Sequence, residues 1–182
     1  GNGGFRENDG SSAYVNVDFG SIRSIHTVES LETEMPVRIE TCTLKTDSGG
    51  PGHSRGGLGM HRELRLLGDE GVYSVLSDRA VVPPFGVAGG LSAASLRVAV
   101  AEAGAAEHDL PTPGKITGRR IREGDRVVME SAGGGGYGDP RERDPDAVRA
   151  DVLAGYVSAG AAHRFYGVAL DEDGTVDLAE TR

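Results

Sequence analysis

Apolar and polar residues alternate along much of the chain with the period of two that is typical of β-strands. The clearest alternations cover residues 37–45 and 60–66. Because a glycine-rich stretch joins them, we expect these two strands to pair antiparallel, with residues 47–59 as the connecting loop. Weaker patterns predict further short strands over residues 14–17, 72–77, 80–82, 96–100 and 125–131. Many short strands separated by turns favour an antiparallel sandwich or a curled sheet.

The pattern becomes helical near the C-terminus. Asp144 and Pro145 form a helix-start signal, because an aspartate side chain caps free N–H groups and a proline fits the first turn. Apolar residues at helical spacing follow as far as Gly155, and a second helix is predicted over residues 158–167. The predicted fold class is therefore α+β, mainly β, with glycine-rich antiparallel sheets and two short helices near the C-terminus. The length fits a single domain over residues 1–182.

Composition and charge exclude several classes of protein. The chain has 29 glycines among 182 residues without a fixed period, which excludes collagen and indicates many tight turns. A net charge of −9 with no basic stripe argues against binding to nucleic acid. No apolar run approaches the ~20 residues that span a bilayer, and no signal-peptide core is present, so we expect a soluble, cytoplasmic protein with no membrane partner. The single cysteine, Cys42, is expected to be a small buried hydrophobe in a strand.

The sequence around Ser48 resembles the surroundings of the nucleophile in chymotrypsin-type serine proteases. In those enzymes the chain order is His, Asp, Ser, and a complete β-barrel precedes the serine. Here 47 residues precede Ser48, and Asp9 and Asp18 come before His26 rather than after it. We therefore interpret the likeness as accidental, although histidines further along the chain leave a nucleophilic Ser48 open as an alternative.

Other polar groups of the same loop are better candidates for binding a ligand. Arg55 and the loop N–H groups could clamp a carboxylate or phosphate, or Arg55 could pair with Asp47 and hold the loop closed. His53 is a possible proton carrier. Asp78 and Arg79, adjacent residues between two predicted strands, are a second polar pair. They could face the same ligand-binding cleft as the loop, or they could form a turn-stabilising ion pair. The candidate substrate-binding residues are Asp47, Ser48, His53, Arg55, Asp78 and Arg79.

Catalytic residues are not assigned from the pattern. The five histidines do not have zinc-site spacing, so we expect no metal or cofactor to be bound wholly by this chain. The glycine runs also lack the lysine and serine or threonine of a phosphate-binding loop.

Several motifs occur together in an order that resembles a known family. They are residues 32–38 with Pro36, residues 47–52 and 55–59, residues 78–79 with 83–86 and 89–90, residues 124–125, residues 133–140, residues 143–145, residues 151–152, Gly155, Ser158 and residues 166–168. In this order they resemble the C-terminal part of the B-type subunit in the hydantoinase B/5-oxoprolinase family. Relatives in that family include the large subunits of acetone and acetophenone carboxylases.

The resemblance implies an ATP-dependent enzyme that opens a cyclic amide such as a hydantoin, 5-oxoproline or a lactam. An A-type ATPase subunit would carry ATP and Mg, and a divalent metal, Zn or Mn, would lie in the N-terminal portion of the B-type subunit, which this chain lacks. The implied partners are that A-type subunit, the N-terminal portion and a small-molecule substrate, in a hetero-oligomer. Two alternatives remain open: a subunit of an ATP-dependent ketone carboxylase, and a non-catalytic assembly module of such a complex.

Overall fold

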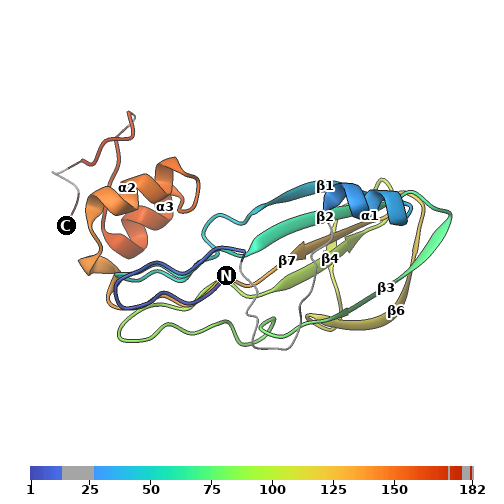
Figure 1. Ribbon diagram of the computed structural model, residues 1–182, viewed down its shortest axis with the longest axis horizontal. Coiled ribbons are helices and arrows are strands. Elements are labelled where there is room, and N and C mark those ends of the chain that lie inside the picture. Colours follow the sequence, from blue (N-terminus) through green and yellow to red (C-terminus); the bar gives the residue numbers. More distant parts are fainter. Residues whose placement is uncertain (14–26, 172, 178–180, 182) are drawn as a thin grey trace.

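The computed structural model describes residues 1–13, 27–171, 173–177 and 181 (Figure 1). The strand predicted over residues 14–17 lies outside them. Along the chain the elements are α1 (Val28–Glu34), β1 (Val37–Leu44), β2 (Met60–Leu66), β3 (Glu70–Leu76), β4 (Arg97–Ala101), β5 (His108–Asp109), β6 (Lys115–Arg122), β7 (Arg126–Glu130), η2 (Pro140–Glu142), α2 (Pro145–Leu153), α3 (Ala159–Ala161) and η3 (Ala162–Tyr166). The sheets lie at one end, α2 and α3 lie at the other, and extended segments join the two ends (Figure 1).

The strands form one five-stranded sheet in the order β1-β2-β7-β4-β5 and one two-stranded sheet of β3 and β6. β1 and β2 pair antiparallel with Val37 opposite Leu66, which confirms the pairing predicted across the glycine-rich loop. Both sheets contribute to one apolar cluster, whose buried members are Val37, Leu66, Val98, Val100, Leu110, Ile121 and Val127. The predicted α+β, mainly β fold class is confirmed.

The β6 strand was not predicted, because a bulge breaks its alternation. Gly118 has a left-handed φ of 72°, and the β3–β6 register shifts between Tyr73 and Val75. Ile116 and Ile121, an odd number of positions apart, therefore both pack toward the core.

Two further local predictions were wrong. Residues 80–82 form no strand, since Arg79 turns the chain with a left-handed φ of 66° and Pro83 follows directly. Cys42 is exposed rather than buried, because β1 is the outer strand of its sheet. The short helix α1, capped by the Thr27 side chain, was missed because its seven residues include no buried position.

The C-terminal helices confirm the predicted caps. The Asp144 side chain accepts a hydrogen bond from the N–H of Asp146 at 3.0 Å, and Gly155 follows α2 with φ 74°. Ser158 caps α3 in the same way, and the helix continues through one π-helical turn, η3, to Gly167. These helices have their own core, formed by Val148, Val157, Ala162, Tyr166 and Val168.

Four consecutive glycines, residues 133–136, form the central segment, or axis, of the region between the sheets and the C-terminal helices. A Cβ atom added to Gly133 would lie 1.9 Å from the carbonyl oxygen of Ser48, and one added to Gly136 would lie 2.0 Å from that of Pro51. Between them, Gly134 faces the backbone of Asn2 and Gly135 faces the backbone of Phe85. Gly133 and Gly136, three residues apart, therefore face the same neighbouring segment, the loop 47–59. This spacing is expected for an extended helix with three residues per turn.

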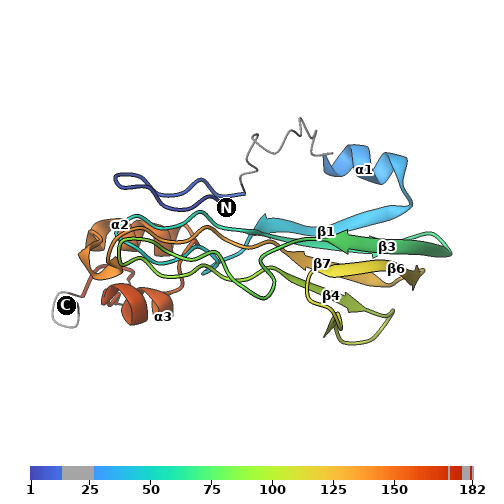
Figure 2. The same cartoon turned by 90° about the horizontal axis from the view of Figure 1, so that it is seen from below.

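Three segments surround this axis, and backbone hydrogen bonds join them to it. They are the N-terminal residues 1–13, the loop 47–59 and residues 85–94. The N–H groups of Gly4 and Gly50 donate to the carbonyls of Gly135 and Gly134, both at 2.8 Å, and the N–H of Gly136 donates to Leu91 at 3.0 Å. We call residues 133–138 with these three segments the glycine bundle, whose extended segments run side by side in both views (Figures 1 and 2).

Candidate functional site

Ser48 lies at the base of the loop 47–59 and is completely buried. Its hydroxyl donates to the carbonyl of Lys45 and accepts from the N–H of Gly59 at 2.9 Å, so it ties the two ends of the loop together. No histidine nitrogen is hydrogen-bonded to it among the described residues. This geometry supports a structural role for Ser48, because a substrate carbonyl has no access to its oxygen.

Asp47 connects the same loop to the C-terminal helices. Its carboxylate accepts from the N–H of Ser158 at 2.8 Å, and its own N–H donates to the carbonyl of Tyr156 at 3.0 Å. The ion pair expected between Asp47 and Arg55 is therefore wrong. Both residues do hold the loop, but through partners outside it.

Arg55 belongs to a buried cluster of charged side chains. Its Nε donates to Asp151 Oδ2 at 3.2 Å, and Arg143 Nη2 donates to the same oxygen at 2.9 Å. Arg143 also holds Asp9 with two hydrogen bonds of 2.7 Å. Arg55 is 4% exposed, and the Tyr156 ring lies 5.2 Å from its guanidinium carbon. We call Asp9, Arg55, Arg143 and Asp151 the charge cluster.

The charge cluster joins four parts of the chain: the N-terminal segment, the loop 47–59, the junction after η2, and α2. Sequence reasoning missed Asp9, Arg143 and Asp151, because the partners of the arginines lie up to 134 residues away along the chain. A signal was present, since Arg143 and Asp151 belong to motifs that carry the family resemblance. An arginine held by two carboxylates and an aromatic face is positioned to stabilise the fold.

Tyr166 lies beside the charge cluster. Burial raises the pKa of Tyr166 to about 12. Within the described part of the chain, neither its hydroxyl nor Arg143 Nε has a hydrogen-bond partner. Tyr166 and Phe165 also line a pocket of about 140 Å³ between the loop 47–59 and the C-terminal helices.

Asp9 makes the stability of the fold dependent on pH. Burial raises the pKa of Asp9, but hydrogen bonds and charge from Arg143 and Arg55 outweigh burial and hold the pKa below its ordinary value of 3.8. Such a carboxyl stabilises the fold above its unfolded pKa and loses this contribution as pH falls through the folded pKa. We expect wild type to melt above Asp9→Asn at neutral pH, and the difference to shrink below about pH 4. Thermal unfolding of both proteins from neutral pH to below about pH 4 checks this prediction. A difference in melting temperature that does not change with pH would contradict the role given to Asp9.

His53 lies on the surface of the glycine bundle. Its backbone N–H donates to the carbonyl of Gly138 at 3.2 Å, which fixes its place beside the second glycine run. It lines an open pocket of about 360 Å³ with Arg6, Tyr137, Asp139, Glu142 and two small residues. Its exposed imidazole therefore lies among groups of both charges.

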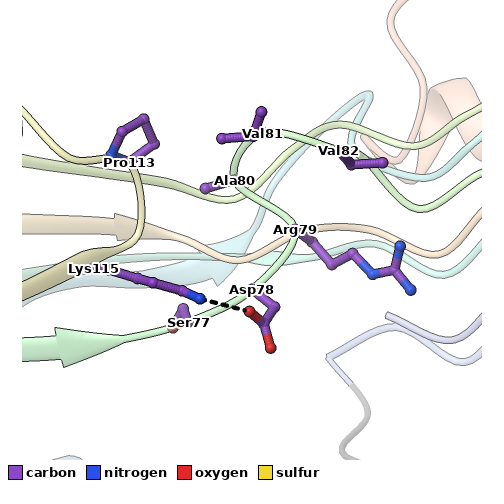
Figure 3. A pocket seen from close by; sticks show the side chains of 8 residues that line it. All are labelled: Ser77, Asp78, Arg79, Ala80, Val81, Val82, Pro113 and Lys115. Carbon is purple, nitrogen blue, oxygen red and sulfur yellow. Dashed lines mark ion pairs between the residues drawn. The ribbon is translucent and has the colours of Figure 1, made fainter.

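Asp78 and Arg79 lie on a different pocket, of about 380 Å³ (Figure 3). The ion pair expected between them is wrong, because Asp78 pairs with Lys115 at 3.2 Å. Figure 3 shows the Arg79 side chain extending away from this pair. The six candidates therefore do not form one site. Ser48 and Arg55 are buried in the bundle, Asp47 is exposed beside the C-terminal helices, His53 lines its own pocket, and Asp78 and Arg79 line another.

Neither a metal cluster nor a membrane helix is found in residues 1–13, 27–171, 173–177 and 181. No three His, Cys, Asp or Glu side chains of this set are grouped so that they could hold a metal ion. No helix in it has the length and apolar character needed to cross a bilayer.

Comparison with known proteins places the chain in a family. The model of the family described as hydantoinase B/oxoprolinase matches residues 1–140. The putative B-type subunit of a D-/L-hydantoinase from Pseudomonas sp. (strain NS671) is 30% identical over 179 residues, which cover 98% of this chain and 30% of that protein.

Two solved structures have the same fold. An ATP-dependent caprolactamase from Pseudomonas jessenii is 34% identical with a TM-score of 0.74, over 85% of this chain and 27% of that one. A nucleotide-free acetone carboxylase is 25% identical with a TM-score of 0.79, over 97% and 28%. The chain thus spans less than a third of each relative. With the family model matching more than half of the chain and these relatives alongside it, the chain belongs to the hydantoinase B/oxoprolinase family.

Proposed function

We propose that this chain is part of an ATP-dependent enzyme that opens a cyclic amide such as a hydantoin, 5-oxoproline or a lactam. The observation that carries the proposal is the match to a hydantoinase polypeptide over 98% of the chain. Identity to the ATP-dependent caprolactamase, at 34%, is also higher than the 25% identity to acetone carboxylase. The similar fold of acetone carboxylase supports the second candidate, an ATP-dependent ketone carboxylase.

The chemistry requires partners beyond this chain. In the proposal, ATP and Mg lie on an A-type subunit, and a divalent metal, Zn or Mn, lies in the N-terminal portion of the B-type polypeptide. ATP would supply a phosphoryl group that converts the resonance-stabilised amide oxygen into a better leaving group. In the proposal, this chain contributes a rigid surface to the active site, because the glycine bundle and the charge cluster fix the backbone around the His53 pocket.

Of the six candidates, His53 is best placed to touch a substrate. Ser48 and Arg55 are buried and hydrogen-bonded to other parts of the fold, and the Asp47 carboxylate already accepts a hydrogen bond from the N–H of Ser158. His53 is exposed in a pocket with charged neighbours. We propose that it passes a proton to or from the ring-opening intermediate.

The complete enzyme, with its A-type subunit and whole B-type polypeptide, tests the reaction class. We expect hydantoins or lactams to stimulate ATP hydrolysis, with the ring-opened acid as the product. Stimulation by ketones with bicarbonate instead, with a carboxylated product, would favour the carboxylase.

The His53→Gln variant tests whether this chain takes part in catalysis or is a non-catalytic assembly module. Loss of a proton carrier lowers kcat by about a hundredfold and changes the pH profile, whereas a module would keep both. His163→Gln is the matched control, because His163 is exposed on η3, outside this pocket. Unchanged turnover of His53→Gln in an assembled enzyme would exclude the proposed role.

A further inference from the structure

Five large apolar side chains are exposed within a short stretch between the end of β3 and the glycine bundle. They are Leu76 (84% exposed), Val81 (77%), Val82 (64%), Phe85 (66%) and Val87 (47%). Single exposed apolar residues are ordinary on a protein surface, but several large ones exposed within one short stretch of chain favour a contact with another protein surface. We call these five residues the apolar strip.

The backbone that carries the apolar strip is held in place. The N–H of Ser77 donates to the carbonyl of Gly114 at 2.8 Å, and the N–H of Leu96 donates to that of Arg79 at 3.0 Å. At the far end, the N–H of Val87 donates to Gly136 on the bundle axis at 3.0 Å. The side chains are therefore presented on a fixed frame, which lowers the entropy lost when a partner binds.

A pocket opens beside the apolar strip (Figure 3). It has a volume of about 380 Å³, and residues 77–82 form one side while Pro113 and Lys115 form the other. This is ample room for an apolar anchor side chain of a partner, and such anchors carry most of the energy of protein interfaces.

Arg79 provides a charge at the same place. It has a left-handed φ of 66°, which is costly for a residue with a long side chain. Its guanidinium makes no hydrogen bond or ion pair with any residue in the described part of the chain, and it extends outward in Figure 3. An interface arginine binds best to a carboxylate, because its planar donors match the two oxygens. The surface thus fits a segment that combines an apolar anchor with a neighbouring Asp or Glu.

We infer that the apolar strip, its pocket and Arg79 bind the remaining portion of the family's B-type polypeptide. The inference rests on the proposed function, in which this chain works with that portion. The matched relatives have more than two-thirds of their length outside the region shared with this chain. Surfaces that stay covered permanently are more apolar than those of transient partners, and a portion of the same polypeptide is such a permanent neighbour.

Photocrosslinking in the complete enzyme tests this surface. Val82 is replaced with the photoreactive amino acid p-benzoyl-phenylalanine, and mass spectrometry identifies the crosslinked peptide. We expect a peptide from the remaining portion of the B-type polypeptide, containing an apolar residue next to Asp or Glu. A crosslink to the A-type subunit, a crosslink to a second copy of this chain, or no crosslink would each overturn the inference. The same probe at Leu153, which is 61% exposed on α2, is the control and should give no such peptide.

A charge variant provides a second, independent result. Arg79→Ala should lower the yield of the Val82 crosslink about tenfold, and Arg79→Lys should restore part of it, because the positive charge returns. Equal crosslink yields with arginine, alanine and lysine at position 79 would show that Arg79 is not part of the interface. Crosslinking requires no turnover, so failure of the proposed reaction would leave this result readable.

Discussion

Gly134→Ala is expected to lower the free energy of unfolding by about 3 kcal/mol or more, enough to unfold many domains of this size. The Cβ of alanine would lie 1.8 Å from the carbonyl oxygen of Asn2 and 2.1 Å from its carbon. Both are backbone atoms, which no side-chain rotation can move away. The N-terminal segment would have to leave the bundle axis and would lose its hydrogen bonds to it. Urea unfolding followed by circular dichroism measures the change.

Gly160→Ala is the matched control for this variant. Gly160 lies in α3, and nothing lies within 4 Å of an added Cβ atom there. Alanine also favours a helix by about 1 kcal/mol relative to glycine, so the control should keep or raise stability. Equal stabilities of the two variants would show that the glycine bundle is not closely packed.

Asp151→Asn is expected to destabilise the fold by about 3–5 kcal/mol, the usual effect of removing one partner from a buried ion pair. Asp151 Oδ2 is the shared acceptor of Arg55 at 3.2 Å and of Arg143 at 2.9 Å. Asparagine has almost the same shape, so the change removes charge without leaving a cavity. Asp9 would then be the single carboxylate of the charge cluster, facing two buried arginines. The measurement is the denaturant midpoint at neutral pH.

Asp146→Asn on the same helix controls for the loss of one negative charge from α2. Asp146 is exposed in the first turn, where a carboxylate contributes about 0.3–1 kcal/mol through the helix dipole. If Asp151→Asn cost no more than this control, the charge cluster would not hold the N-terminal segment and α2 together. Lower yield of folded Asp151→Asn protein would agree with the prediction, since the cluster joins segments far apart in sequence.

Local features were well predicted. The caps at Asp144 and Ser158 and the turn at Gly155 rest on hydrogen bonds and backbone conformations within a few residues, so the short-range pattern contains them. The β1–β2 pair was predicted because both strands alternate cleanly and follow each other in the chain. The β6 strand was missed because the bulge at Gly118 shifts its alternation.

The candidate site was predicted less completely. The N–H groups of the loop 47–59 were candidates for clamping a ligand, but the loop backbone packs against the glycines of residues 133–138. Arg55 was placed in the correct loop with the wrong partner, because Asp151 lies 96 residues away along the chain. Ser48 has the local sequence of a nucleophile, yet it is buried and bonded to the ends of its own loop.

The sequence by itself determined the fold class, the strand pair around the glycine-rich loop, the capped C-terminal helices and, through the order of its motifs, the family. These depend on interactions between residues close in the chain or on the identity of whole motifs. Only the tertiary structure decided which backbone each glycine of the axis approaches, which carboxylates neutralise Arg55 and Arg143, and which apolar residues stay exposed. The reason is physical: close packing and charge pairing in the bundle are set by segments that meet in space from distant parts of the chain, and no local pattern specifies such a meeting.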